Sequence, residues 1–509
     1  MSIDLLLYNG NIHCIDDKHT EAGWMASKDG RIFDLGQGMG YKKYLDSAKE
    51  IRDLEGRTVF PGFYDNHFNL VFSGIFDYAV NLRHVETLEE LFDAVRKKAY
   101  VTEQGETIMC VNFNENQIAE KRYPTRQELD RCAPENPVII NSSSYHACSV
   151  NSLMLRQLRI PYTLEGIEKG EDGSPNGILT KRASLFSRTG ISANLSDEYR
   201  EKVVSMVMEN AIQHGVTTIV DFEGGYISHE KNARFVLQNK SKFPVDIKLF
   251  YQSTSLQKAL DNDCRQVGGL FLDGSFTGRS AAISRPYADT GDCGSLFYTD
   301  EEINEYVLAA HKENLQLAAH CDGDRAVAQL LKSYELAQKT YYREDPRFRI
   351  EHCELISDES IKKAAELDVI LSMQPAYESI WGGEGELYDN ILGELSHKTN
   401  RFKPILDAGI TLAFGSDHAV APLDPLLGIH YAVNHPKAEN RIDLESAIRA
   451  YTINGAYAVF EEKEKGSLEI GKKCDAVVLN DNPFDINPQN IKNLVALMTI
   501  KEGVILYER

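Results

Sequence analysis

The sequence predicts an α/β fold: a (β/α)8 TIM-like barrel with a small β domain built from both chain ends and a large insertion after the first barrel strand. Three observations predict it. Eight strand-like runs alternate with helical stretches in the middle of the chain, which is typical of a parallel sheet or barrel. Both chain ends have the texture of short strands broken by turns. One stretch between the first two runs is too long for a simple crossover.

The chain ends are predicted to form one small β domain from residues 1–58 and 464–509. Three segments near the start are strand-like and are separated by turns: 4–14, 23–34 and 51–60. The same texture returns after about residue 464. Because the termini of a domain often lie close together, we interpret the two ends as halves of one domain.

The barrel is predicted over residues 59–463. Its eight strand-like runs are 60–67, 216–222, 245–251, 269–273, 315–320, 348–352, 369–373 and 411–417. Helical patterns lie between several of them, for example at 301–313 and 324–340. The stretch of about 72–195, between the first two runs, is predicted to be an insertion packed over the barrel mouth as a lid or substrate wall.

Composition and charge exclude several classes of protein. The 509 residues are 42% hydrophobic and 26% charged, as in an ordinary globular protein. A formal net charge of −21, with no Lys- or Arg-rich stripe, excludes nucleic acid as a favourable partner. No stretch approaches the roughly 18 apolar residues of a membrane span. Nine scattered cysteines without a Cys-x-x-Cys pair, and a start without a targeting pattern, predict a cytoplasmic protein with reduced thiols.

Several strand-like runs end in an ionisable residue, which a strand buried on both faces does not need for packing. These residues are His67, Asp273, His320, His352 and Asp417. The carboxyl ends of parallel barrel strands meet at one mouth, where catalytic groups gather. One such residue alone is more often structural, for example as a turn or helix cap. Three histidines and one aspartate at the same end of one barrel, however, match the ligands of a catalytic zinc with an open position.

A series of short motifs follows in a fixed order along nearly the whole chain. They are Pro61-Gly62-Phe63 with His67-Phe68-Asn69, Leu272-Asp273-Gly274-Ser275, His320 to Ala326, Ile350-Glu351-His352, Gly415-Ser416-Asp417, Ala421 to Pro425, Thr452-Ile453-Asn454, and Gly466 to Lys472 with Asp475. In this order they resemble the amidohydrolase superfamily, in the branch with N-substituted formamide deformylases. The resemblance implies a metal-dependent hydrolase on a (β/α)8 barrel.

The resemblance also implies a set of metal ligands, and this sequence departs from it twice. The branch carries His-x-His in the opening segment and a carboxylated lysine, bridging two metals, in the fourth strand. Asn69 and Gly269 stand at these places. Asn69 would be a weaker oxygen ligand than imidazole, and the ligands that remain are His67, His320, His352 and Asp417. We therefore predict at most one divalent metal, with zinc favoured over iron or manganese.

A bound metal would give Asp417 the role of general base. It would take a proton from the activated water and pass it to the leaving nitrogen. His352 or His320, if not bound to metal, would then steady the developing oxyanion.

Four further residues are predicted to contact substrate: His146, Asn114, Trp381 and His418. His146 resembles a family residue near the active site, and Asn114 follows a strand-like run. Trp381 stands with two glycines after the seventh run, where an aromatic residue often shapes a pocket. Three of them have a plainer interpretation: a surface loop for His146, packing for Trp381, and for His418 an orientation away from its neighbour Asp417.

The predicted function is hydrolysis of an amide, formamide or amidine-like C–N bond in a small molecule. The alternative is a barrel that has lost catalysis and binds a small molecule, because two ligands are replaced. A different barrel reaction, such as decarboxylation or isomerisation, is the third possibility. The expected partner is a small-molecule substrate, and a homodimer would also suit so large a barrel.

Overall fold

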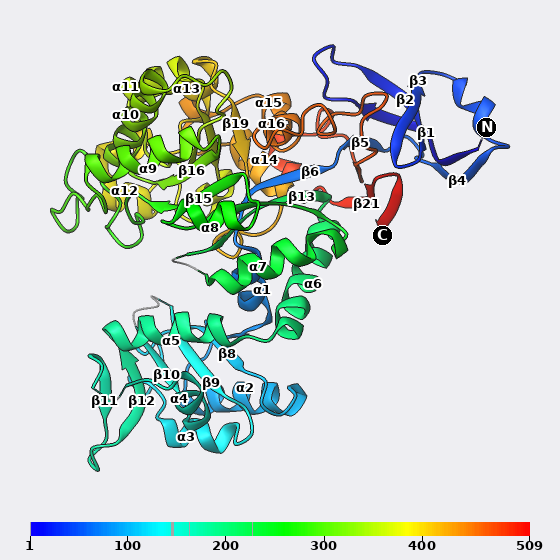
Figure 1. Ribbon diagram of the computed structural model, residues 1–509. Helices are drawn as coiled ribbons and strands as arrows, with labels where there is room; N and C mark the ends of the chain where they lie inside the picture. The colour runs from blue at the N-terminus through cyan, green and yellow to red at the C-terminus, as the bar shows by residue number, and fades with distance from the viewer. Residues whose placement is uncertain (1, 144–146, 162, 226–227) are drawn as a thin grey trace. The chain divides into compact units, whose positions relative to one another are not determined.

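The computed structural model describes residues 2–143, 147–161, 163–225 and 228–509 (Figure 1). The chain divides into two compact units. The larger unit comprises Met1–Leu70, Met208–Tyr226 and Ala233–Arg509, and the smaller one comprises Val71–Val207 and Ile227–Asn232. Of the predicted site residues that the structure describes, Asn114 belongs to the smaller unit and the others belong to the larger one.

A near-closed parallel sheet of eight strands forms the centre of the larger unit. The strands follow one another in chain order: β6 (Phe63–Phe68), β13 (Val216–Gly224), β14 (Asp246–Gln252), β15 (Gln266–Phe271), β16 (Gln316–Cys321), β17 (Arg349–His352), β18 (Ile370–Met373) and β19 (Leu412–Phe414). The edge strands β6 and β19 also lie side by side, and the Asp417 amide donates to the His67 carbonyl oxygen at 3.0 Å. The α/β barrel that the sequence predicts is confirmed.

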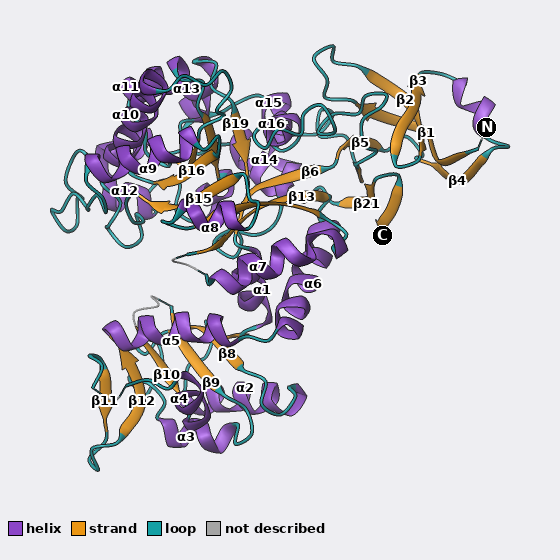
Figure 2. Cartoon of the chain, viewed as in Figure 1, coloured by secondary structure: helices purple, strands orange, loops and turns teal. Residues whose placement is uncertain are grey.

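Helices alternate with these strands, as Figure 2 shows. The longer ones are α9 (Asp300–Lys312), α10 (Asp324–Thr340), α11 (Asp358–Glu366) and α14 (Pro425–Val433). α9 begins at a capping box in which Thr299 and Glu302 satisfy free backbone amides of the first turn. A sheet between helices is buried on both faces, and every residue of β13 is buried. This burial explains why the strands appear in the sequence as continuous runs rather than as an alternating pattern.

A second sheet joins strands from both chain ends. Its order is β22 (Val504–Glu508), β21 (Ala496–Lys501), β20 (Ala476–Leu479), β5 (Thr58–Pro61), β1 (Ile3–His13), β2 (Glu21–Lys28) and β3 (Arg31–Gly36), and β4 (Ala48–Asp53) pairs with β1. The two ends meet where β20 runs antiparallel to β5, with Val478 opposite Val59. This sheet and the barrel form one compact unit, so the domain limits 1–58 with 464–509, and 59–463, remain a prediction.

The smaller unit contains a mixed sheet with its own apolar core. The strand order is β11 (Ile167–Lys169), β12 (Pro175–Thr180), β10 (Ala147–Val150), β9 (Val138–Ser142), β8 (Ile108–Phe113) and β7 (Val80–Asn81). The predicted insertion of about 72–195 falls within this unit, and its role as a lid remains a prediction. In the described part of the chain, no helix combines the length and apolar character needed to cross a membrane.

Candidate active site

The four side chains predicted to remain as metal ligands come together at the carboxyl ends of the barrel strands. His67 lies in β6, His320 in β16 and His352 at the end of β17, and Asp417 follows β19. The ring centroids of His67 and His320 are 4.4 and 4.7 Å from that of His352. His67 Nε2 is 3.9 Å from Asp417 Oδ1. Parallel strands thus gather these groups at one end of the barrel.

A buried ion pair orients His67. Its Nδ1 lies 2.8 Å from Glu351 Oε2, and Arg349 donates to both oxygens of Glu351 at 2.8 and 3.0 Å. Burial would raise the pKa of Glu351, but the Arg349 guanidinium and His67 outweigh it and hold this pKa below its ordinary value. In the neutral tautomer that donates from Nδ1 to the Glu351 carboxylate, Nε2 is an acceptor on the side of Asp417.

His352 is held as a neutral imidazole. Its Nδ1 lies 3.0 Å from Gln374 Oε1, which accepts the ring hydrogen. Burial, together with the adjacent rings of His67 and His320, lowers the pKa of His352 well below its ordinary value. His352 has a φ of 69°, and Asp417 has a φ of 52°. Left-handed backbone at residues other than glycine is strained, and such strain clusters at functional sites.

Asp417 has a protein hydrogen-bond donor on each carboxylate oxygen. The Tyr377 hydroxyl donates to Oδ2 at 2.5 Å, and the Asn69 amide nitrogen donates to Oδ1 at 3.4 Å. Burial raises the pKa of Asp417, although His67 and Tyr377 oppose this shift. A raised pKa favours proton acceptance near neutral pH, as a general base requires.

His320 lies between two buried carboxyl groups. Its Nδ1 is 3.6 Å from Asp273 Oδ1, and its Nε2 is 3.6 Å from Asp322 Oδ1. Asp273 accepts hydrogen bonds from three backbone amides, so its charge is stabilised locally. Burial and the neighbouring Glu354 raise the pKa of Asp322 well above its ordinary value, and burial raises that of Glu354 to about 8. Several buried carboxyl groups therefore lie on this side of the cluster.

The residue types of the cluster fit one divalent cation, but their donor atoms have not converged on a point. As the side chains lie, no group of three or more His, Cys, Asp and Glu residues within the described ranges could hold a metal ion. The 3.9 Å between His67 Nε2 and Asp417 Oδ1 exceeds the about 3.3 Å between two ligands of a tetrahedral zinc. The carbonyl oxygen of Asn69 and Nδ1 of His320 are buried without a hydrogen-bond partner. The cluster thus retains unsatisfied polar atoms that a cation could engage.

The profile of the amidohydrolase family matches residues 50–507. The chain belongs to the amidohydrolase family. It is 26% identical to an N-substituted formamide deformylase of Arthrobacter pascens, over 99% of this chain and 98% of that protein. It is 28% identical to the protein LONG AFTER FAR-RED 3 of Arabidopsis thaliana, over 99% of this chain and 91% of that protein.

A solved structure supports the same assignment. An uncharacterized metal-dependent hydrolase from Pyrococcus furiosus superposes with a TM-score of 0.80 at 26% identity, covering 95% of this chain and 99% of that one. The resemblance inferred from the sequence motifs is therefore confirmed. This amidohydrolase is a hydrolase of C–N bonds other than peptide bonds, and its family implies a divalent metal.

Of the predicted substrate residues of this amidohydrolase, Trp381 and His418 lie in the larger unit, which also holds the candidate site. His146 lies outside the described residues. Asn114 belongs to the smaller unit, where its Oδ1 accepts the Asn116 amide in a turn. Trp381 packs edge-on against Tyr377, with ring centroids 4.6 Å apart. His418 Nδ1 lies 3.1 Å from the Ala421 carbonyl oxygen, so this ring nitrogen is engaged away from Asp417. Their roles in substrate binding remain predictions.

The sequence motifs do not reveal the residues that orient the predicted ligands. Glu351 stands in the motif Ile350-Glu351-His352, but the motif predicts no role for it or for Arg349. Both are charged residues of β17, a strand whose every residue is buried. Buried charges must be paired, and that rule could have marked them. Gln374 and Tyr377 follow β18 without any pattern that predicts their partners.

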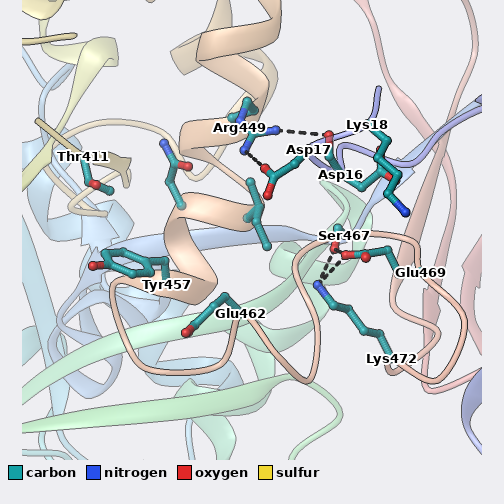
Figure 3. Close-up of a pocket in the computed structure, with 12 residues that line it drawn as sticks. Asp16, Asp17, Lys18, Thr411, Arg449, Tyr457, Glu462, Ser467, Glu469 and Lys472 are labelled. Atoms are coloured by element: carbon teal, nitrogen blue, oxygen red, sulfur yellow. Dashed lines mark hydrogen bonds and ion pairs between the residues drawn. The ribbon is translucent and has the colours of Figure 1, made fainter. Parts of the chain in front are cut away.

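The cavity in Figure 3 is separate from the candidate site of this amidohydrolase. It has a volume of about 430 Å³. Its lining includes Thr411, which precedes β19, whereas the site residues lie at the opposite, carboxyl ends of the strands. Charges around it pair with one another, Arg449 with Asp17 at 3.1 Å and Lys472 with Glu469 at 2.7 Å. It is a polar crevice at the amino-terminal end of the barrel, and we assign it no function.

Proposed function

We propose that this amidohydrolase hydrolyses the C–N bond of a small amide or formamide with one divalent cation. The cation would be held by His67, His320, His352 and Asp417, with the Asn69 carbonyl oxygen as a weak additional ligand. One observation carries the proposal: His67 and His352 each engage Nδ1 with an outer polar group, and His67 Nε2 lies 3.9 Å from Asp417 Oδ1. Metal-binding histidines are typically oriented in this way. Imidazole donors favour zinc, although iron and manganese also suit such a site.

The reaction requires a base, a proton for the leaving group and stabilisation of an oxyanion. A bound cation supplies Lewis-acid chemistry that makes water more acidic and a carbonyl more electrophilic. Asp417 accepts a proton from the attacking water, whose oxygen bonds to the carbonyl carbon. The C–N bond then breaks, and Asp417 returns the proton to the leaving nitrogen. Tyr377 holds Asp417 in place, and His352 or His320, if not a ligand, stabilises the oxyanion.

Formamides are the substrates that we propose to test first. The support is the similarity to an N-substituted formamide deformylase along 98% of that protein. Hydrolysis of a formamide would release formate and an amine. Contacts from Trp381, His418, Asn114 and His146 would select among such substrates. A homodimer and a cytoplasmic location remain predictions.

Metal content and turnover test this proposal. After exhaustive dialysis we expect at most one divalent ion per chain, because no lysine carboxylate neutralises a second, and two equivalents would contradict the proposal. On a panel of N-alkyl and N-aryl formamides, Asp417→Asn should lower kcat by about 10²–10⁴-fold, since it keeps the shape but cannot take the proton. Asp407→Asn, at the end of α13 (Phe402–Asp407), is the control and should retain wild-type turnover. Undiminished turnover by Asp417→Asn would show that the base is another group.

A binding protein is the second candidate function. The observation that favours it is that Tyr377 and Asn69 already satisfy both oxygens of Asp417 without a cation. This candidate predicts that the same formamides bind in calorimetric titrations without being consumed. Asp417→Asn should then leave their affinity nearly unchanged, because no proton is transferred.

A further inference from the structure

Asp322 is a buried carboxyl group that the proposed reaction does not use. It directly follows β16 and is 3% exposed. Its Oδ1 has no hydrogen-bond partner and lies 3.6 Å from His320 Nε2. A buried carboxyl oxygen without a partner destabilises a fold, because it has lost its hydration without compensation. The stability of the fold therefore does not explain why an aspartate with an unpartnered oxygen stands at position 322.

The other contacts of Asp322 leave this one oxygen available. The carboxyl group hydrogen-bonds with that of Glu354, which in turn accepts a hydrogen bond from the Tyr388 hydroxyl. The main chain is also fixed, since the Asp322 amide donates to Asp273 at 3.0 Å and its carbonyl accepts the Leu355 amide at 2.9 Å. Oδ1 is thus held near His320 by a rigid backbone.

The spacing of this oxygen from His320 suits two ligands of one ion. Two ligands of a tetrahedral zinc, with bonds of about 2 Å, are about 3.3 Å apart. The 3.6 Å between His320 Nε2 and Asp322 Oδ1 is nearer to this value than the 3.9 Å between His67 Nε2 and Asp417 Oδ1. Both atoms come from one strand end, with only Cys321 between the two residues.

We propose that Asp322 is a ligand of the divalent cation, next to His320. It would contribute the negative charge that Gly269, in place of the carboxylated lysine, does not provide, and a stronger ligand than the Asn69 amide oxygen. With Asp417, two carboxylates would neutralise one dication in a buried site, where unpaired charge is costly. This inference rests on the proposed function, since it concerns the same cation.

Zn²⁺ affinity and metal-free stability test this proposal together. Asp322→Asn should weaken Zn²⁺ binding at least about 100-fold in a chelator competition, more than the loss of an outer partner typically causes. The metal-free variant should melt at the wild-type temperature or above it, because a buried carboxyl group with one unpartnered oxygen is replaced by a neutral amide. Glu378→Gln is the matched control: Glu378 is also buried with one unpartnered oxygen, but its other oxygen contacts Asn400. It should bind Zn²⁺ like the wild type.

A second variant tests directly whether the side chain at position 322 binds the metal. Co²⁺ bound to Asp322→Cys should show a thiolate-to-cobalt charge-transfer band in the near ultraviolet that Co²⁺-loaded wild type lacks. The proposal is overturned if Asp322→Asn keeps wild-type Zn²⁺ affinity, if metal-free Asp322→Asn melts clearly lower, or if the Cys variant binds Co²⁺ without the band. A wild type that binds neither Zn²⁺ nor Co²⁺ would refute the proposed function as well. Zn²⁺ binding that is insensitive to Asp322→Asn would refute this inference alone.

Discussion

Replacing Glu351 with glutamine should destabilise the barrel, because it leaves a buried guanidinium without its counter-charge. Arg349 is fully buried, and it donates to both oxygens of Glu351 and to the Asn66 carbonyl at 2.8 Å. Its Nη1 already lacks a hydrogen-bond partner. Removing one partner of a buried ion pair typically costs about 3–5 kcal/mol. An exposed pair contributes about 0–1 kcal/mol, so Glu55→Gln, which breaks the surface pair with Arg57, is the control.

Urea unfolding at several pH values tests this prediction. The folded-state pKa of Glu351 is lowered, so its stabilisation is present above the unfolded-state pKa and is lost as pH falls toward the folded-state pKa. The difference in unfolding free energy between wild type and Glu351→Gln should therefore be largest near pH 7 and should shrink below about pH 4.3, the ordinary Glu pKa. A difference under about 1 kcal/mol at pH 7, or one that stays constant into acid, would refute the assignment of a buried ion pair.

Two further substitutions probe the cluster itself. Gly415→Ala should lower the melting temperature, because its Cβ would lie 2.5 Å from the His67 amide nitrogen and 2.8 Å from Asp65 Oδ1. Overpacking of this kind costs about 1–3 kcal/mol. An unchanged melting curve would contradict the close approach. Asn69→His should strengthen Zn²⁺ binding at least about 10-fold in the same chelator competition, because imidazole is a better zinc ligand than an amide. Unchanged affinity would mean that position 69 does not reach the ion.

The barrel could be predicted because each strand leaves a local mark in the sequence. A strand between helices is buried on both faces and appears as a short apolar run, such as β13. Errors occur where the pattern is interrupted. The sequence predicts the fourth run over 269–273, whereas β15 spans Gln266–Phe271, because Gly268 and Gly269 break the apolar run. It predicts that the eighth run reaches residue 417, but β19 ends at Phe414, before the tight approach at Gly415.

Which residue types stand at the strand ends follows from the sequence alone. His67, His320, His352 and Asp417 could be chosen because strand order and direction fix where strand ends meet, whatever the side chains do in detail. The resemblance to the family predicts in addition that Asn69 and Gly269 stand where two metal ligands are usual.

The orientation of these groups depends on contacts that form only in the folded barrel. Glu351 and His67 are 284 residues apart, and no local period connects them. The same holds for the hydrogen bond from Tyr377 to Asp417 and for the packing that leaves Asp322 Oδ1 without a partner. Whether a segment forms a strand depends largely on residues close to one another in the chain, so the periodicity of the sequence predicts it. Ring orientation, proton position and the satisfaction of a carboxyl oxygen are set by atoms from distant segments, so they exist only once the barrel has formed.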